Sequence, residues 1–334
     1  MAGYAGVGKT TLAKYFAETI DGKVLYAAFT GKAALVMRKN GCWGASTIHS
    51  LIYRAEETKL GDVRFVLNRK SPLADASLLI IDECSMVDDK IGLDLLRFNV
   101  PILVLGDPAQ LPPVNGTGFF TGSEPDVLLT EIHRQAEDNP IIHLATQIRN
   151  GVMPKMGEYG SSKIVSDISP EEFMNHEQII AGRNITRNSL NQMYREELGY
   201  TDKLPAPGDR LICLRNNNKL GLFNGGMFRL VNRNKTKSDF YSLLTVMDMD
   251  NETNRALKVR VHNSLFDGSA RPDWKLLKGT EEFDYGYAIT SHKAQGSQWD
   301  SVLIFDESHY FRDDKYRWLY TAVTRAQSNV TIYR

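Results

Sequence analysis

The sequence predicts an α/β protein built on parallel sheets, and three of its features support this fold class. Short continuous apolar runs alternate with helical patterns, as they do where strands buried on both faces are joined by crossover helices. A glycine-rich loop of the phosphate-binding type stands at residues 3–10, directly before such a helical pattern. Between about residues 207 and 280, short strands separated by Gly, Asn and Asp predict a small β-module.

The loop at residues 3–10 reads G-Y-A-G-V-G-K-T and fills every fixed position of the pattern G-x-x-x-x-G-K-[ST]. In such a loop backbone N–H groups point at β- and γ-phosphates, Lys9 adds a charge, and Thr10 offers its hydroxyl to Mg²⁺. The next residues predict a helix whose positive N-terminus faces the same anion. A chance glycine-rich loop is the bland alternative, and the helical pattern after it argues against that interpretation.

A second signature ends the apolar run L-L-I-I at residues 78–81. Asp82 and Glu83 follow it, at what would be the carboxyl edge of a parallel sheet, where α/β nucleotide sites lie. There Asp82 would hold Mg²⁺ through water, and Glu83 would orient and deprotonate an attacking water. An Asp-Glu pair alone is usually an ordinary turn, but together with the upstream loop it predicts a hydrolytic NTPase.

Later segments add polar groups to this picture. G-D-P-A-Q-L-P-P follows the buried run at residues 102–105, and its amide Gln110 is suited to sense a γ-phosphate. T-S-H-K-A-Q-G-S at residues 290–297 is rich in donors, and Arg325 could close on the phosphate from a second domain as an internal arginine finger. Two extended stretches around Gly61-Asp62 predict a β-hairpin.

Composition limits the function classes. Lys+Arg 40 against Asp+Glu 40 leaves no global basic field, so any contact with nucleic acid must be local. Cys42, Cys84 and Cys213 are odd in number and widely spaced, which argues against a disulfide framework or a zinc site and favours buried thiols. Because no apolar run reaches membrane-spanning length and no leader pattern is seen, we expect a soluble cytoplasmic protein.

The set of motifs resembles that of a superfamily 1 helicase of the RecD/Dda branch, in the family order and over nearly the whole chain. The matching segments are GYAGVGKTT (motif I), AFTGKAA at 28–34 (motif Ia), STIHSLI at 46–52, IIDECSM at 80–86 (motif II), LGDPAQLPPV at 105–114 (motif III), LTEIHRQ at 129–135 (motif IV), ITSHKAQGSQWD at 289–300 (motif V) and YTAVTRA at 320–326 (motif VI).

The resemblance implies two RecA-like P-loop domains with parallel sheets, the first at 1–52 and 73–133 and the second at 134–206 and 281–334. It also implies a duplex-splitting pin hairpin at 53–72 and a small SH3-like β-module at 207–280. The expected activity is that of an ATP-dependent DNA helicase, a monomeric motor that moves 5′ to 3′ on single-stranded DNA and opens fork DNA. The expected setting is the cytoplasm of a bacterial or phage-infected cell, with replication or recombination proteins as partners.

The resemblance also assigns residues. The catalytic set would be Lys9, Asp82, Glu83, Gln110, Arg134 and Arg325, with both arginines at the γ-phosphate. ATP would be held by Gly3, Gly6, Gly8, Lys9, Thr10, Thr11 and Gly296, and Mg²⁺ by Thr10 and Asp82. The strand path, made of phosphate contacts indifferent to base sequence, would be lined by Thr30, Lys32, Thr47, His49, Thr290, His292 and Lys293.

The chain also departs from the family pattern. Phe29 stands where the family commonly has proline, which could let that loop stack on a base. The family's adenine-reading glutamine and central strand do not stand before Gly3, so we expect loose adenine recognition and either a weakly held loop or another segment in the strand's place.

Alternative interpretations remain at this stage. His49 could be a structural histidine, and Lys32 and Lys293 could be solvated surface lysines. At the level of function, the alternatives are a nucleotide-switched nucleic-acid clamp that does not unwind, a catalytically weak binding subunit, and RNA in place of DNA.

Overall fold

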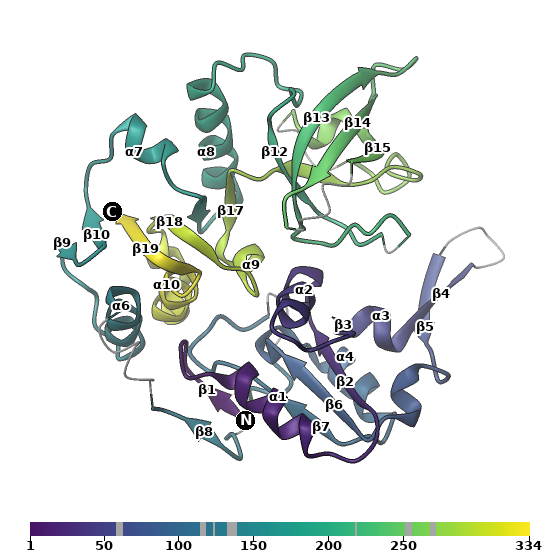
Figure 1. Ribbon diagram of the computed structural model, residues 1–334. Helices are drawn as coiled ribbons and strands as arrows, with labels where there is room; N and C mark the ends of the chain where they lie inside the picture. Colours follow the sequence, from purple (N-terminus) through teal and green to yellow (C-terminus); the bar gives the residue numbers. More distant parts are fainter. Residues whose placement is uncertain are drawn as a thin grey trace. The chain divides into compact units, whose positions relative to one another are not determined.

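The computed structural model describes residues 1–57, 63–113, 118–122, 124–131, 139–217, 219–250, 256–267 and 272–334. The chain divides into two compact units, and the helices and strands of each are labelled in Figure 1. The first unit comprises Met1–Pro154, Gln295–Ser297 and Asp313–Thr324, and the second comprises Lys155–Ala294, Gln298–Arg312 and Arg325–Arg334. Both contain a mainly parallel sheet with helices, so the predicted α/β class is confirmed.

Four parallel strands form the main sheet of the first unit, in the order β3-β2-β6-β7. Their bounds are Ser46–Thr47 (β3), Val24–Ala28 (β2), Leu78–Asp82 (β6) and Ile102–Val104 (β7). The remaining elements of this unit are α1 (Lys9–Glu18), α2 (Gly31–Lys39), α3 (Ile48–Ile52), η1 (Pro72–Asp75), η2 (Cys84–Met86), α4 (Asp89–Leu96), α6 (Pro140–Arg149) and α10 (Lys315–Val323), with β1, β8 and a hairpin given below.

The phosphate-binding loop begins from a two-residue strand, β1 (Ala2–Gly3). This strand pairs in parallel with β8 (Leu128–Leu129), and Ala2 also bridges to Gly106, just past β7. The amino group of Met1 donates to the carbonyl of Val104 over 2.9 Å. The residues directly before the loop therefore pair with β8 and with the chain just past β7. The two expected outcomes, a weakly held loop or another segment in the strand's place, stay predictions.

Strand β6 is buried on both faces because helices cover both sides of the sheet. Leu78 and Ile80 cluster with Ala13 and Ala17 of α1. The alternate residues Leu79 and Ile81 cluster instead with side chains of α3 and α4, including Ile48 and Ile91. Since burial of each large aliphatic side chain contributes about 1.5–3 kcal/mol, this run fixes the strand that carries Asp82.

The predicted hairpin of the first unit is present. Strands β4 (Tyr53–Glu57) and β5 (Val63–Leu67) pair antiparallel, with Tyr53 opposite Leu67 and Glu57 opposite Val63. Gly61-Asp62, the expected turn, lies outside the described residues.

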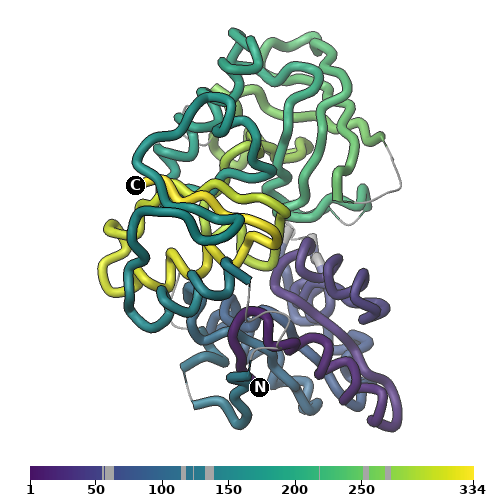
Figure 2. Tube along the Cα trace, turned by 60° about the vertical axis from the view of Figure 1, so that its left-hand side comes forward, coloured from purple at the N-terminus to yellow at the C-terminus, as the bar shows by residue number. Residues whose placement is uncertain are grey.

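The second unit has a sheet in the order β17-β11-β18-β19-β10-β9, parallel except for the edge strand β9. Its bounds are Ala288–Thr290 (β17), Gln178–Ala181 (β11), Trp299–Phe305 (β18), Ala326–Tyr333 (β19), Ser162–Val165 (β10) and Gly157–Tyr159 (β9), with helices α7 (Pro170–Met174), α8 (Asn184–Glu197) and α9 (Ser291–Ala294). The chain returns at its end to place β19, drawn in yellow, between β18 and β10 (Figure 2). The segment η4 (Ser308–Asp314) follows β18.

An antiparallel sheet, the β-insert, forms the rest of the second unit in the order β15-β14-β13-β12-β16. Its elements are β12 (Arg210–Cys213), β13 (Met227–Lys235), β14 (Tyr241–Asp248), β15 (Ala256–His262), η3 (Asn263–Leu265) and β16 (Phe283–Tyr285). The SH3-like character of this module and the expected domain boundaries stay predictions.

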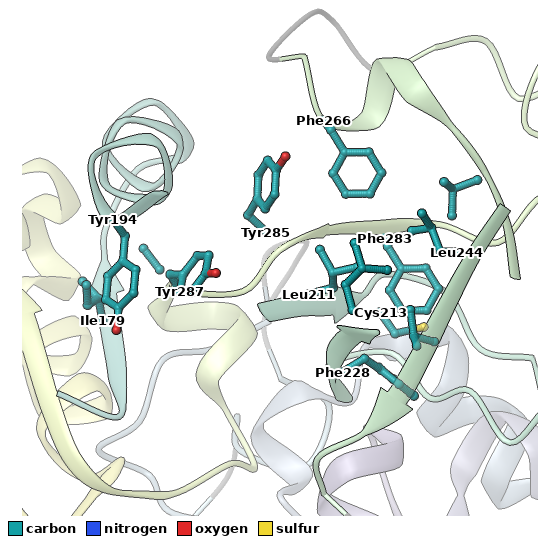
Figure 3. Close-up of a cluster of buried hydrophobic side chains, with 14 of the residues drawn as sticks. Ile179, Tyr194, Leu211, Cys213, Phe228, Leu244, Phe266, Phe283, Tyr285 and Tyr287 are labelled. Atoms are coloured by element: carbon teal, nitrogen blue, oxygen red, sulfur yellow. The ribbon is translucent and has the colours of Figure 1, made fainter. Parts of the chain in front are cut away.

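One apolar cluster serves both sheets of the second unit (Figure 3). It contains Ile179 of β11 and Tyr194 of α8 together with Phe228 and Leu244 of the β-insert. Tyr194 stacks on Tyr287 with ring centroids 4.3 Å apart. The β-insert is therefore packed as a continuation of the α/β core.

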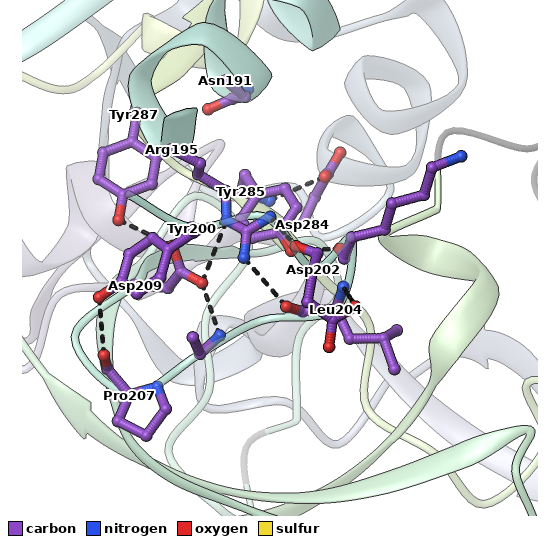
Figure 4. A network of polar contacts seen from close by, with 12 residues as sticks. Asn191, Arg195, Tyr200, Asp202, Leu204, Pro207, Asp209, Asp284, Tyr285 and Tyr287 are labelled. Carbon is purple, nitrogen blue, oxygen red and sulfur yellow. Dashed lines mark hydrogen bonds and ion pairs between the residues drawn. The ribbon is translucent and has the colours of Figure 1, made fainter. Parts of the chain in front are cut away.

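A buried ion pair joins the end of α8 to the start of the β-insert (Figure 4). The Arg195 Nε donates to Asp209 over 3.1 Å, and the side chains are 6% and 0% exposed. Asp209 also accepts from the Tyr287 hydroxyl over 2.9 Å. The two terminal nitrogens of Arg195 donate to backbone carbonyls of Asp202 and Leu204, so this buried cation is satisfied on every side.

Candidate nucleotide site and nucleic-acid interface

The backbone of the phosphate-binding loop is shaped for an anion. Gly6 and Gly8 have φ angles of 81° and 76°, which residues with a Cβ rarely adopt. Gly8 is the N-cap of α1, and no side chain of the described residues caps that helix. The positive helix end thus faces the loop, which is the arrangement by which proteins bind phosphate groups.

Lys9 and Gly3 close the same loop. The Lys9 Nζ donates to the carbonyls of Gly3 over 2.8 Å and Tyr4 over 3.0 Å, which holds the ammonium at the loop. A Cβ on Gly3 would lie 2.7 Å from a methyl carbon of Val7, so this turn requires glycine. The structure brings Gly3, Gly6, Gly8, Lys9, Thr10 and Thr11 into one loop and the helix turn that follows it.

Thr10 and Asp82 meet although they are 72 positions apart in the sequence. The Thr10 hydroxyl donates to Asp82 Oδ2 over 2.8 Å, and Asp82 Oδ1 accepts from the Glu83 N–H over 2.8 Å. Hydroxyl and carboxylate oxygens are the ligands that Mg²⁺ prefers in proteins. The two residues predicted to hold the ion therefore lie side by side.

Glu83 has a left-handed backbone, with φ 55° and ψ 46°. Such a conformation in a non-glycine residue costs on the order of 1–3 kcal/mol and is found mostly at functional sites. Its neighbour Cys84 is buried, and burial raises the pKa of that thiol to about 12. The thiol is thus neutral, and the carboxylates of Asp82 and Glu83 supply the negative charge here.

Gln110 lies in the loop after β7. Its side chain is buried, and its Oε1 accepts no hydrogen bond from the described residues. Leaving a buried acceptor without a donor costs about 1–3 kcal/mol, which a bound water or ligand would recover. The helix end, the ammonium, the Thr10–Asp82 oxygens and this amide together fit a nucleoside triphosphate with Mg²⁺.

In the first unit, the threonines expected on the strand path cap helices. Thr30 accepts from the Ala33 N–H at the start of α2, and Thr47 accepts from the Ser50 N–H at the start of α3. Lys32 is only 9% exposed, so it is not a solvated surface lysine. Their contacts with DNA stay predictions.

His49 lies between two aromatic rings. Its centroid is 6.0 Å from that of Phe29 and 5.6 Å from that of Tyr53. Although part of the ring is exposed, loss of hydration lowers the pKa of His49 below its ordinary value, so it is neutral at pH 7. It offers a phosphate a hydrogen bond but no charge, and Phe29 is already in contact with its ring.

In the second unit, Thr290 ends β17 while His292 and Lys293 lie in α9. Lys293 lines a groove of about 930 Å³ whose walls are α8 and residues 264–267. Among the residues that line this groove, Arg187 pairs with Asp284 over 2.8 Å. Burial raises the pKa of Asp284, although Arg187 opposes this shift.

The other predicted residues have different placements. Gly296 has φ 72°, and its Cβ would lie 2.8 Å from the Cβ of Ala33, so it lies against the start of α2. Arg325 is buried, and its carbonyl accepts from the Trp299 N–H over 2.9 Å. Arg134 lies outside the described residues. The nucleotide contacts of all three stay predictions.

Sequence reasoning missed two groups of contacts. Glu307 accepts hydrogen bonds from the Gly182 and Arg183 N–H groups, the Arg183 Nε and the Thr186 hydroxyl, over 2.6–2.9 Å. No local sequence pattern predicts these hydrogen bonds of Glu307. Tyr320 contacts both the phosphate-binding loop and Asp107, and here a signal existed, because it stands within YTAVTRA.

Two family models match the chain. Residues 1–169, just over half of it, match the model described as an AAA domain, and residues 285–333 match the UvrD-like helicase C-terminal domain. The ATP-dependent RecD2 DNA helicase of Deinococcus radiodurans is 28% identical over 98% of this chain and 45% of its own length. The ATP-dependent DNA helicase dda of Enterobacteria phage T4 is 30% identical over 60% of this chain and 52% of its own. The chain thus spans about half the length of these relatives.

Solved structures share the fold. A Pif1 helicase structure concerned with unwinding at forked double-stranded DNA matches with a TM-score of 0.63, at 23% identity, covering 99% of this chain and 86% of that one. Bacteroides Pif1 bound to single-stranded DNA matches with a TM-score of 0.61, at 22% identity, covering 99% and 87%. In the described parts of this chain, no helix has both the length and the apolar character needed to cross a bilayer.

Proposed function

The chain belongs to the superfamily 1 helicases of the RecD, Dda and Pif1 branch, and from this membership we propose that it is an ATP-dependent DNA helicase. It would hydrolyse ATP with Mg²⁺, move 5′ to 3′ on single-stranded DNA and separate the duplex at a fork. The observation that carries the proposal is the 2.8 Å hydrogen bond from Thr10 to Asp82. It joins the phosphate-binding loop to a carboxylate at a helix end that no side chain of the described residues caps.

The residues of the first unit divide the chemistry among them. Lys9 and the backbone N–H groups of the loop would bind the phosphates, and Thr10 with Asp82 would hold Mg²⁺, whose charge lowers the barrier to phosphoryl transfer. Glu83 would take a proton from the attacking water. Gln110, with its unsatisfied oxygen, would accept a hydrogen bond from that water. Arg134 and Arg325 would offset charge on the γ-phosphate.

The DNA partner is supported by the relatives and by the placement of the expected residues. Thr30, Thr47 and Thr290 each lie at the carboxyl end of a parallel strand, the edge at which α/β sheets bind ligands. Because these groups address the sugar-phosphate backbone, binding would be indifferent to sequence. The monomeric state, the cytoplasmic location and partners in replication or recombination belong to the same proposal.

Strand displacement on tailed duplexes tests the function. We expect the chain with ATP and Mg²⁺ to separate a duplex with a 5′ single-stranded tail and to leave a 3′-tailed duplex intact. Hydrolysis stimulated by DNA without displacement would favour the nucleotide-switched clamp. Absence of hydrolysis would favour a binding subunit, and faster displacement from an RNA tail would reassign the substrate.

The hairpin of β4 and β5 is proposed as the pin. Phe65 on β5 is 67% exposed, which suits a ring that meets a base pair at the fork. We predict that Phe65→Ala lowers the rate of displacement about tenfold, since base–aromatic stacking is worth about 1–3 kcal/mol, while DNA-stimulated ATPase stays intact. The matched control is Phe240→Ala, which removes a ring 69% exposed in the β-insert and should change neither rate. Equal unwinding by both variants would assign the wedge elsewhere.

A further inference from the structure

The hydroxyl of Tyr320 joins two loops of the first unit that are remote in sequence. Tyr320 lies in α10 and is 1% exposed. Its hydroxyl donates to Asp107 Oδ2 over 2.6 Å and accepts from the N–H of Ala5, in the phosphate-binding loop, over 3.0 Å. One oxygen atom is therefore the meeting point of residues 5, 107 and 320.

Neighbouring contacts hold the loop of residues 107–111 against α10 and the phosphate-binding loop against α6. The Thr321 hydroxyl accepts from the Leu111 N–H over 2.9 Å, and Gln295 Nε2 donates to the Leu111 carbonyl over 2.9 Å. The guanidinium of Arg149 lies 3.5 Å from the centroid of the Tyr4 ring, and its helix α6 packs on α10. The loop from residue 107 to residue 111, which contains Gln110, is thus fastened at both ends.

The chemistry of Tyr320 and Asp107 favours a hydrogen bond that stays formed. Burial, reinforced by the charge of Asp107, raises the pKa of Tyr320, so the phenol is protonated and donates. Asp107 is itself 1% exposed, and a buried carboxylate needs a donor. Asp107 Oδ1 accepts from the Ala109 N–H over 3.0 Å, so Tyr320 is the donor to the other oxygen, Oδ2. If the two loops moved apart, either Oδ2 or the Ala5 N–H would lose the contact with the Tyr320 hydroxyl, so the loops are expected to move together.

We propose that Tyr320 is a positioning residue of the ATPase, whose hydroxyl transmits a change in the phosphate-binding loop to the Gln110 loop and to α10. The inference rests on the proposed function, because it concerns the same nucleotide site. Arg325 lies two residues past the end of α10. If α10 moves with the two loops, the backbone of Arg325 is expected to move as well.

The test is Tyr320→Phe, which removes one oxygen and keeps the ring. We expect kcat for ATP with saturating oligo-dT to fall about tenfold, the factor that corresponds to about 1.4 kcal/mol, with the KM for ATP unchanged. Stimulation by oligo-dT should fall with it. The matched control is Tyr316→Phe, one turn earlier on α10, where the ring lies beside Lys315 and kcat should be unaltered.

A double-mutant cycle shows whether the hydroxyl acts through Asp107. In an Asp107→Ala background, Tyr320→Phe should change kcat by less than about twofold, because the shared contact is already gone. Additive losses would overturn the inference. So would an unchanged kcat in an active parent enzyme, or a fall in kcat that comes with a raised KM and a lowered melting temperature. A parent chain without ATPase activity would instead refute the proposed function.

Discussion

At the scale of single residues, replacements of Lys9 and of Glu83 are expected to impair different steps. The Lys9 ammonium lies against the loop that is proposed to bind the phosphates in the ground state and in the transition state alike. We predict that Lys9→Ala weakens nucleotide binding and turnover together, whereas Glu83→Gln lowers turnover by roughly 10²–10⁴-fold with binding little changed. Titration with a fluorescent ATP analogue and measurement of phosphate release separate the two. Parental turnover in the glutamine variant would exclude Glu83 as the base.

Glu307 offers a residue-scale prediction on pH. Burial alone would raise its pKa, but the hydrogen bonds that its carboxylate accepts outweigh burial and hold the pKa below the ordinary value. Because the folded pKa is depressed, the stabilisation is complete above the unfolded value of about 4.3 and is lost as the pH falls through the folded pKa. We predict that Glu307→Gln lowers the free energy of unfolding by about 1–2 kcal/mol at pH 7, since an amide nitrogen would face donors.

Urea titrations at several pH values check this prediction. The difference between parent and Glu307→Gln should shrink below about pH 4. Glu172→Gln is the control, because Glu172 is half-exposed in its ion pair with Lys163 and should contribute no more than about 1 kcal/mol. A difference independent of pH would mean that the carboxylate charge is not what stabilises the start of α8.

At the scale of elements, the buried pair Arg195–Asp209 fixes the junction between α8 and the β-insert. We predict that Asp209→Ala lowers the free energy of unfolding by about 3–5 kcal/mol, because it leaves a buried guanidinium without its counter-charge. The control is Arg233→Ala, which breaks a pair with Asp202 whose side chains are 21% and 61% exposed, and which should cost at most about 1 kcal/mol. Similar costs in urea unfolding would contradict the assigned role of burial.

The elements differ in how far the sequence could predict them. The run at residues 78–81 is apolar and short, and it became β6 with both faces covered. Strands β1, β3 and β8 have two residues each, too few for any period. Strand β3 forms along the longer strand β2, whereas β1 and β8 pair with each other, across 126 positions in the sequence. The antiparallel sheet of the β-insert also includes β16 (Phe283–Tyr285), which lies beyond the range 207–280 in which the sequence predicted this module. Phe283 of β16 packs on Phe228 of β13, with ring centroids 5.5 Å apart, and no local sequence pattern predicts this contact.

At the scale of the whole molecule, nucleotide is expected to stabilise one unit. The loop, Asp82 and Gln110 all belong to the first unit. We predict that ATP at about 100 times its dissociation constant adds about 2.7 kcal/mol of protection there. Hydrogen exchange should slow at residues 3–11 and 82–86 and stay unchanged in β13 and β14, with Lys9→Ala as the control. Equal slowing in both units would show that the binding energy is spread over the chain.

The features of the candidate site that the sequence did not predict depend on contacts between residues far apart in the chain. The motifs predicted the phosphate-binding loop and a common site for Thr10 and Asp82, which the structure brings together. The roles of these two residues as Mg²⁺ ligands and of Gln110 as a γ-phosphate sensor stay predictions. The link from Ala5 through Tyr320 to Asp107 spans 315 and 213 positions, and no spacing rule connects them. Likewise, nothing in the sequence shows that Thr47 uses its hydroxyl to cap α3 or that loss of hydration lowers the pKa of His49.

Transfer of the β-insert between related chains would have to preserve a continuous set of apolar contacts. Phe228 and Leu244 of the insert share their cluster with Ile179 and Tyr194 of the α/β sheet. Foreign side chains of other volumes would leave voids or clashes in this cluster. The β-insert therefore does not pack independently of the sheet. Chimaeric proteins are expected to fold only when the whole second unit is exchanged. During evolution, a change in side-chain volume on the β-insert is expected to be accompanied by a compensating change in side-chain volume on the α/β sheet.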